Sequence, residues 1–221
     1  MTANGASELK SPVEPEESAG VLHPTGEPPR KRRPWGPIVA LLLFVAAVAA
    51  ITWMHQRQAP STGGPFELID ASTGRQVTDR DFRGKWLLVF FGYTHCPDFC
   101  PTTLSDIADT MAMLGALADQ VQPLFITVDP KRDTQQALNE YTGAFDPRIR
   151  GLTGTPDQIA IAAKAYGVYY AKRETGDDYY MDHTGATYVM RPDGTYERSF
   201  LSTDGPEEMT KRLRHLLSEG R

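Results

Sequence analysis

The chain has two cysteines, Cys96 and Cys100, and only three residues separate them. They follow the apolar run from Trp86 to Phe91, which predicts a buried strand, while the residues after Pro101 predict a helix. Backbone amides and the macrodipole at the start of a helix stabilise a thiolate over a thiol. A thiolate is the nucleophile of disulfide exchange and a soft ligand for copper(I), so the motif predicts redox chemistry or metal binding.

A structural disulfide is the alternative use of this cysteine pair, because a separation of four positions can bring two Cα atoms within bridging distance. A bridge that closes so short a loop contributes about 2 kcal/mol in the chain-entropy account, less than one that closes a long loop. Such a role would also leave the helix start unused. We therefore favour a reactive or metal-binding pair.

An apolar segment precedes the domain that carries the cysteines. Residues 35–54 contain no charged side chain, and a helix of this length spans the hydrocarbon core of a bilayer. The basic cluster Arg30 to Arg33 comes before it, so the tail is expected in the cytoplasm and the C-terminal domain on the outer, periplasmic side of the inner membrane. A cleavable signal peptide is the alternative, but the apolar segment is longer than such peptides need, and we favour an uncleaved anchor.

The rest of the chain divides by composition. Residues 1–34 are rich in Pro, Glu, Gly and Ser and predict a disordered cytoplasmic tail, and residues 55–64 predict a linker. Residues 65–221 have the length of a single domain. The net charge is −5 and the domain has no basic stripe, so nucleic acid is not expected as a partner. We find no glycine-rich motif for phosphate or dinucleotide binding.

Apolar patterns in the domain predict the order of its elements. The order begins with strand, helix, strand and helix, and a further helix follows from Thr155 to Tyr166. A strand at 168–171, an antiparallel hairpin with its turn at 192–194 and a last helix at 206–217 complete the domain. This order predicts an α/β fold, a thioredoxin-like domain with an inserted or extra hairpin. Reactive cysteines after the first core strand suit that fold.

Four sequence blocks resemble the signatures of the Sco/SenC family. They are the cysteine block at 92–101, Val128-Asp129-Pro130-Lys131-Arg132-Asp133, Gly151-Leu152-Thr153-Gly154-Thr155-Pro156, and Asp182-His183-Thr184. The blocks follow the order of that family across nearly the whole domain. Members of the family are membrane-anchored thioredoxin-like proteins that bind one copper ion through two cysteines and a distant histidine.

The resemblance implies that Cys96, Cys100 and His183 are copper ligands. It implies a metallochaperone that assists assembly of the CuA site in cytochrome c oxidase subunit II. Further partners would be another periplasmic copper chaperone or a thiol reductase. The alternative function is a thiol:disulfide oxidoreductase that keeps the copper-site cysteines of the oxidase reduced, with Cys96 and Cys100 as its catalytic residues. Two thiolates and an imidazole suit both copper(I) and copper(II).

Residues near the three expected ligands have more ordinary roles. Asp182 adjoins His183 but is expected on the opposite face of a strand, so it is a poor candidate to orient the imidazole. His95 directly precedes Cys96, and a histidine beside a ligand rarely folds back onto the same ion. Met181 is a weak candidate for an additional ligand. Asp129 is expected to cap a turn, with an effect on thiol pKa or on a partner as the alternative.

Overall fold

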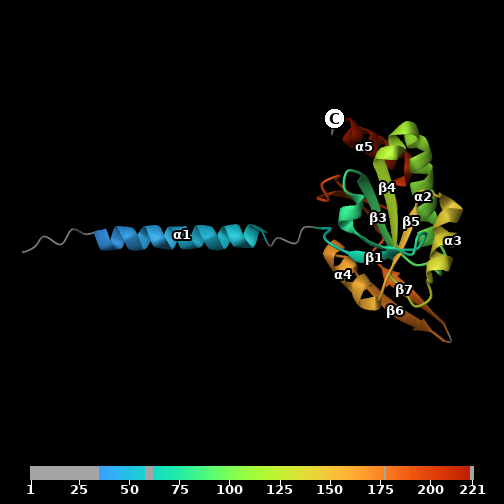
Figure 1. Cartoon of the computed structure of the whole chain (residues 1–221), viewed down its shortest axis with the longest axis horizontal. Helices are drawn as coiled ribbons and strands as arrows, with labels where there is room; N and C mark the ends of the chain where they lie inside the picture. Colours follow the sequence, from blue (N-terminus) through green and yellow to red (C-terminus); the bar gives the residue numbers. More distant parts are fainter. Residues whose placement is uncertain (1–34, 58–61, 177, 220–221) are drawn as a thin grey trace, which may run out of the picture. The chain divides into compact units, whose positions relative to one another are not determined.

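The computed structural model describes residues 35–57, 62–176 and 178–219. The predicted cytoplasmic tail at 1–34 and part of the predicted linker lie outside the described residues. The chain divides into two compact units between Thr52 and Trp53. The first described element is helix α1 (Trp35–Arg57), and the other helices and strands belong to the C-terminal domain (Figure 1).

Helix α1 has the length and composition of a membrane-spanning segment over Trp35–Thr52. Its large apolar side chains are exposed, among them Leu41, Leu42 and Phe44, and they point in all directions around the helix axis. A helix that is apolar all round is stable in a hydrocarbon environment rather than in water. A signal sequence has the same properties, so the uncleaved anchor stays a prediction.

The C-terminal domain is built on a seven-stranded sheet with the order β2-β1-β5-β4-β3-β8-β9. Strand β4 runs parallel to both β3 and β5, whereas β8 is antiparallel to β3. The strands are β1 (Glu67–Asp70), β2 (Gln76–Thr78), β3 (Trp86–Gly92), β4 (Val121–Thr127), β5 (Arg150–Thr153), β8 (Ala186–Met190) and β9 (Tyr196–Leu201). This sheet agrees with the predicted thioredoxin-like α/β class.

Strand β3 forms the centre of the sheet and leads into the cysteine motif. All seven of its residues are buried, which explains the unbroken apolar run, because both faces of the sheet are covered at this central strand. Phe90 lies beside Phe125 of β4 and Thr187 of β8. Phe90 and Phe91 point to opposite faces, and the Phe91 ring contacts Tyr166 of a covering helix.

The four helices described in the domain were predicted, with ends that differ from the predicted ones. They are α2 (Phe99–Leu114), α3 (Gln135–Phe145), α4 (Pro156–Tyr166) and α5 (Gly205–Glu219). Helix α2 starts three residues before the predicted start, because Pro101 fits in the first turn, where its missing N–H is not needed. It ends at Leu114, Gly115 follows with φ 59°, and a 3₁₀ segment (Gly115–Gln120) continues the chain.

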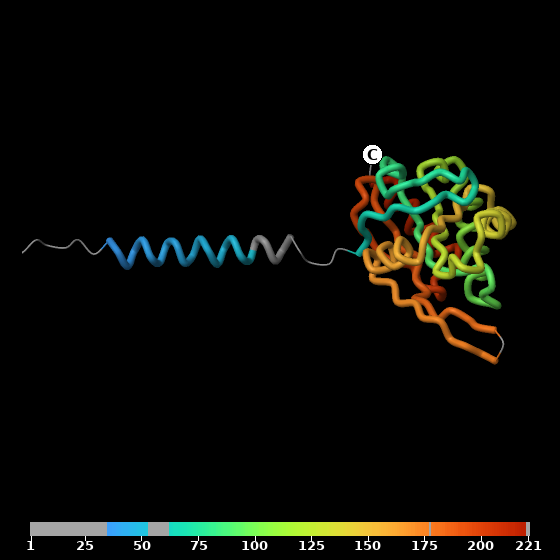
Figure 2. The backbone as a smooth tube through the Cα atoms, turned by 60° about the horizontal axis from the view of Figure 1, so that its bottom comes forward, coloured from blue at the N-terminus to red at the C-terminus, as the bar shows by residue number. Residues whose placement is uncertain are grey.

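A separate hairpin extends from the domain (Figure 2). Its strands are β6 (Tyr170–Thr175) and β7 (Asp178–His183), and Tyr170 pairs with His183 at its base. The sequence pattern predicted only the beginning of β6, because the two strands are at most partly buried and lack a clear apolar alternation. Strands β2 and β5 were also not predicted, since each has only three or four residues.

Arg132 attaches the hairpin to the loop after β4. Its Nε donates a hydrogen bond to Asp129 Oδ2 (2.5 Å), and its guanidinium lies 3.6 Å from the centroid of the Tyr179 ring. The Tyr179 hydroxyl donates to the other carboxylate oxygen of Asp129 (3.0 Å). This network links β7, the strand that ends at His183, to the core sheet.

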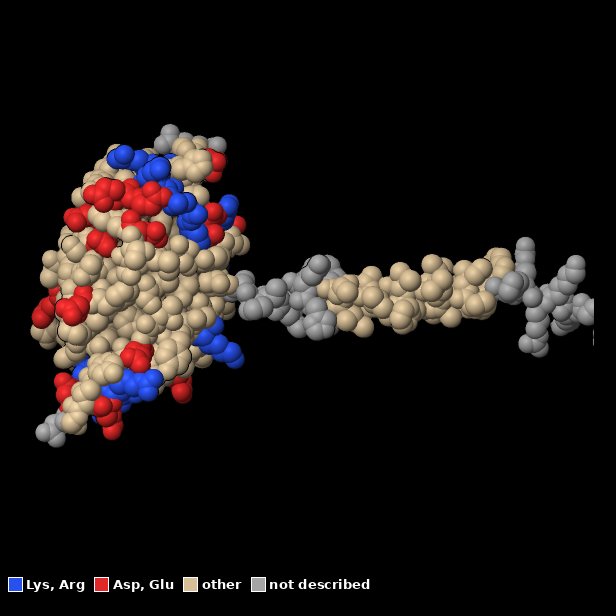
Figure 3. All heavy atoms as spheres, turned by 180° about the vertical axis from the view of Figure 1, so that it is seen from behind, with Lys and Arg blue, Asp and Glu red and all other residues tan. Residues whose placement is uncertain are grey.

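Charged side chains are distributed over both ends of the domain face that Figure 3 shows. Lys and Arg lie beside Asp and Glu there, and a broad area between these groups carries few charges. The expectation that nucleic acid is not a partner stays a prediction.

Candidate metal centre

The two cysteines lie where β3 passes into α2. Cys96 is in the connecting loop, and Cys100 is the second residue of the helix. The amide of Cys100 donates a hydrogen bond to Cys96 Sγ (3.3 Å), so an N–H group of the helix start faces a sulfur, as the motif predicted. Both are free thiols, Cys96 partly buried and Cys100 fully buried.

Gly92 gives Cys100 room beside the central strand. A Cβ atom at this position would lie 2.7 Å from Cys100 Sγ and 2.7 Å from a ring carbon of Phe125. Both distances are far inside van der Waals contact. Glycine at the end of β3 is therefore a requirement of the sulfur position.

Asp133 fixes the loop that carries Cys96. Its carboxylate is buried and accepts hydrogen bonds from the Thr94 amide (3.1 Å), the Thr94 hydroxyl (2.7 Å) and the Thr127 hydroxyl (2.6 Å). A buried carboxylate needs such donors to replace lost water. The β4–α3 connection thereby holds the cysteine loop at Thr94, two residues before Cys96.

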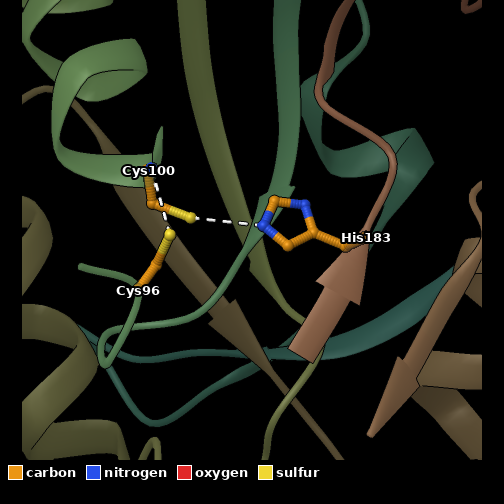
Figure 4. A group of neighbouring side chains, drawn as sticks. All are labelled: Cys96, Cys100 and His183. Atoms are coloured by element: carbon orange, nitrogen blue, oxygen red, sulfur yellow. Dashed lines mark hydrogen bonds between the residues drawn. The ribbon is translucent and has the colours of Figure 1, made fainter. Parts of the chain in front are cut away.

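His183 brings the third donor atom from the end of β7. Its Nε2 lies 3.5 Å from Cys100 Sγ, although 83 positions separate the two residues. The donor atoms of Cys96, Cys100 and His183 all lie within 4.8 Å of one another (Figure 4). The structure thus brings together the three residues that the sequence singled out. Their role as metal ligands stays a prediction.

A backbone carbonyl orients the imidazole of His183. The Nδ1 atom lies 3.2 Å from the Thr184 oxygen, and a carbonyl only accepts, so this contact places the proton on Nδ1 and leaves the Nε2 lone pair directed at the sulfurs. Asp182 instead accepts a hydrogen bond from Arg173 Nε (2.7 Å). The prediction that Asp182 does not orient its neighbour agrees with this geometry.

Three aromatic rings surround the imidazole. The ring centroids of Phe90, Tyr93 and Phe99 lie 6.0, 5.8 and 6.0 Å from that of His183, each in an edge-to-face arrangement. Such contacts restrict the rotation of a side chain that has only two torsion angles. Packing therefore holds His183 beside the thiols.

The two thiols differ in acidity. A hydrogen bond from the Cys100 side chain has the largest influence and lowers the pKa of Cys96 to about 4. Burial opposes this effect, and the backbone amides of Cys100 and Asp98 lower the pKa further. The hydrogen bond to Cys96 and then burial raise the pKa of Cys100. Cys96 is the thiolate of the pair at neutral pH.

The donor set fits a single soft metal ion. Cys100 Sγ and His183 Nε2 are 3.5 Å apart, a separation that suits two ligands of one ion. Bonds from a metal ion to nitrogen or sulfur ligands are about 2.0–2.3 Å long. Two thiolates favour copper(I), and an imidazole adds the nitrogen that copper(II) prefers. The lowered pKa of Cys96 supplies one ligand already deprotonated.

The other candidates have separate contacts. His95 Nδ1 lies 3.0 Å from the Thr94 hydroxyl, and the exposed ring is not part of the cluster. Met181 packs partly buried against the core. The backbone oxygen of Asp129 accepts bonds in the turn, as predicted, but its carboxylate binds the hairpin network described above.

Sequence reasoning missed the residues that support the ligands. Phe90 belongs to an apolar run that indicates only a buried strand, and Tyr93 and Phe99 lie inside the cysteine block, where residue type alone gives them no role. Asp133 ends the sequence block at 128–133, and the sequence alone gives it no role. A buried carboxylate six residues after the end of a strand carries no spacing signal, so only the structure reveals its partners.

Residues 54–218 match the SCO1/SenC family. The chain is 42% identical over 162 residues to the mitochondrial protein SCO2 homolog of Bos taurus, which covers 72% of this chain and 60% of that protein. The chain thus spans about three fifths of this relative's length.

Solved structures have the same domain. Bradyrhizobium japonicum ScoI with copper bound has a TM-score of 0.66 and 45% identity, covering 70% of this chain and 99% of that chain. BsSco, described as a member of the Sco family of cytochrome c oxidase assembly proteins, has a TM-score of 0.57 and 21% identity, covering 72% of this chain and 94% of that chain. The first likeness extends to sequence, and the second shows the fold.

Proposed function

The chain belongs to the SCO1/SenC family, and from this premise we propose that its C-terminal domain binds one copper ion through Cys96, Cys100 and His183. The convergence of the three donor atoms within 4.8 Å carries this proposal. The copper-bound Bradyrhizobium japonicum ScoI, which this chain matches over 99% of its length, supports the choice of metal. The thiolate and imidazole donors support it independently.

The bound copper is the cargo of a metallochaperone in this proposal, delivered to the CuA site in subunit II of cytochrome c oxidase. Membership of the SCO1/SenC family supports this destination, and the copper-bound relative supports copper as the cargo. Cys96 is the more exposed thiol, so a thiolate of the acceptor can replace it while Cys100 and His183 still hold the ion. Exchange of one thiolate for another needs no change in copper oxidation state.

The proposed site lies outside the cytoplasm. Arg30 to Arg33 precede α1, and such clusters stay on the cytoplasmic side of a bilayer. The domain after α1 then faces the periplasm. There an oxidised pair persists, and a reactive dithiol needs copper or a thiol reductase partner to stay available.

A thiol:disulfide oxidoreductase is the second candidate, favoured by the unequal pKa values of the two thiols. The Cys96 thiolate would attack a disulfide of the oxidase subunit and release one partner thiolate. Cys100 would then lose its proton and attack Cys96, which releases the second thiol and leaves a Cys96–Cys100 disulfide. The two electrons pass to the partner, and a separate thiol reductase restores the dithiol.

Titration of the reduced protein with copper tests the proposal. Binding is followed by the charge-transfer absorption from thiolate to copper(II). His183→Ala is expected to abolish stable copper(II) binding and to leave copper(I) partly held by the cysteines. His95→Ala is the matched control, because this exposed histidine adjoins Cys96 but is not part of the cluster. Unchanged copper(II) spectra in His183→Ala would refute the ligand assignment. Disulfide reduction that survives in His183→Ala would favour the second candidate.

A further inference from the structure

Phe99 occupies the last spacer position of the cysteine motif and is the first residue of α2. Its ring is partly buried and contacts two other members of the site, with centroid distances of 6.0 Å to His183 and 6.2 Å to Phe90. The peptide that carries the buried ligand Cys100 therefore also carries a ring that packs on the third ligand. Phe90 and Tyr93, the other two rings, come from the strand and loop before the cysteines.

Gly185, two residues after His183, leaves the space that the Phe99 ring fills. A Cβ atom at Gly185 would lie 2.4 Å from Phe99 Cζ and 2.7 Å from Cε1. Gly185 does not have the positive φ that favours glycine, so its backbone accepts any L residue. The ring of Phe99, rather than the conformation of the chain, requires glycine here.

We propose that Phe99 and Gly185 form a matched pair that holds His183 in its ligating position, an inference that rests on the proposed copper site. Phe99 is a positioning residue in this scheme, and its ring does not contact the ion. The loop from His183 to Gly185 lies against the ring, and the ring moves with the helix start that holds Cys100. The pair therefore fixes the distance between imidazole and thiols across 83 positions of sequence.

The binding of copper(II) depends on this pair of residues more strongly than the binding of copper(I) does. Copper(I) is held by the two thiolates even when the imidazole is displaced, whereas copper(II) needs the nitrogen donor. Residues that orient a metal-binding histidine typically change affinity by about 10- to 100-fold when mutated. We expect Phe99→Ala to lower the copper(II) affinity within this range and to change the copper(I) affinity much less.

A double-mutant cycle in the full chain, purified in detergent, tests the pairing. Gly185→Ala alone should lower the copper(II) affinity, because its methyl group meets the Phe99 ring. The same methyl should have little effect in the Phe99→Ala background, where the ring is gone. Phe91→Leu is the matched control, since this buried ring contacts Tyr166 and Tyr188 on the other face of β3. It should leave the ratio of copper(II) to copper(I) affinity unchanged.

Hydrogen exchange of the metal-free chain gives a second readout. The Thr184 amide donates to the Tyr169 oxygen (2.9 Å), and we expect it to exchange faster in Phe99→Ala and Gly185→Ala than in Phe91→Leu. If the wild-type chain binds no copper, the proposed function fails, while the exchange cycle still decides the pairing. An equal effect of Gly185→Ala in both backgrounds overturns the matched pair. Phe99→Leu replaces Phe99→Ala if the latter does not fold.

Discussion

Replacing Gly92 by alanine tests whether the end of β3 sets the position of the buried thiol. The added methyl would lie 2.7 Å from Cys100 Sγ and from Phe125 Cε2, about 1 Å inside the 3.5–4.0 Å optimum for such contacts. Both neighbours are fully buried, so neither can move into solvent. Overpacking of this kind costs about 1–3 kcal/mol, and we expect the free energy of unfolding of the metal-free domain to fall by that amount.

The same substitution should weaken the metal site. Relief of the clash moves Cys100 Sγ away from β3 by about 1 Å, and that displacement changes its 3.5 Å separation from His183 Nε2. A misplaced ligand loses part of its bond to the ion, so we expect the copper affinity to fall by about tenfold or more. Stability and affinity are thus coupled through one sulfur atom.

Urea unfolding of the reduced, metal-free domain and a competition titration with copper(I) measure the two effects. Gly143→Ala is the matched control, because Gly143 lies in α3 with nothing within 4 Å of its Cβ position. That change should stabilise the domain by up to about 1 kcal/mol through helix propensity. A Gly92→Ala domain that unfolds like the wild type and binds copper equally well would refute the reasoning.

Three further predictions concern the thiols and the membrane. The alkylation rate of Cys96 in the metal-free protein should fall only as the pH drops through about 4, because the thiolate is lost below its pKa, and a midpoint near the ordinary value of about 8.5 would contradict this. Protein oxidised to the Cys96–Cys100 disulfide should bind copper far more weakly than the dithiol, since a disulfide has no thiolate to offer, and equal binding in a titration verified by mass would place the ligands elsewhere. Protease added to intact spheroplasts should digest the C-terminal domain and spare residues 1–34, and a protected domain would reverse the orientation.

The two cysteine ligands could be predicted from the sequence, because residue type and spacing indicate their chemistry. Two cysteines with three residues between them, after an apolar run, indicate a site at the start of a helix, and the structure has them there. His183 came from the resemblance to a family and not from any pattern in the chain. Nothing in its surroundings marks it, because β7 is a partly buried strand with mixed polarity.

The support of the site could not be predicted, because it depends on contacts between distant residues. Gly185 is a glycine because of the Phe99 ring, and Gly151 is one because a Cβ there would lie 2.8 Å from Leu138 Cγ in α3. Neither position has the positive φ of a turn. Sequence signals for glycine come from turns, so close approaches of this kind become visible only in the folded chain.

The distance in sequence between Cys100 and His183 determines whether copper can bind before the domain folds. An ion held between them closes a loop of 83 positions, and in the chain-entropy account such a crosslink amounts to about 4–5 kcal/mol of stabilisation against unfolding. An unfolded chain offers the ion only the two neighbouring thiols. A polypeptide that crosses the membrane unfolded therefore cannot carry the complete site with it, and we expect loading to follow folding on the far side.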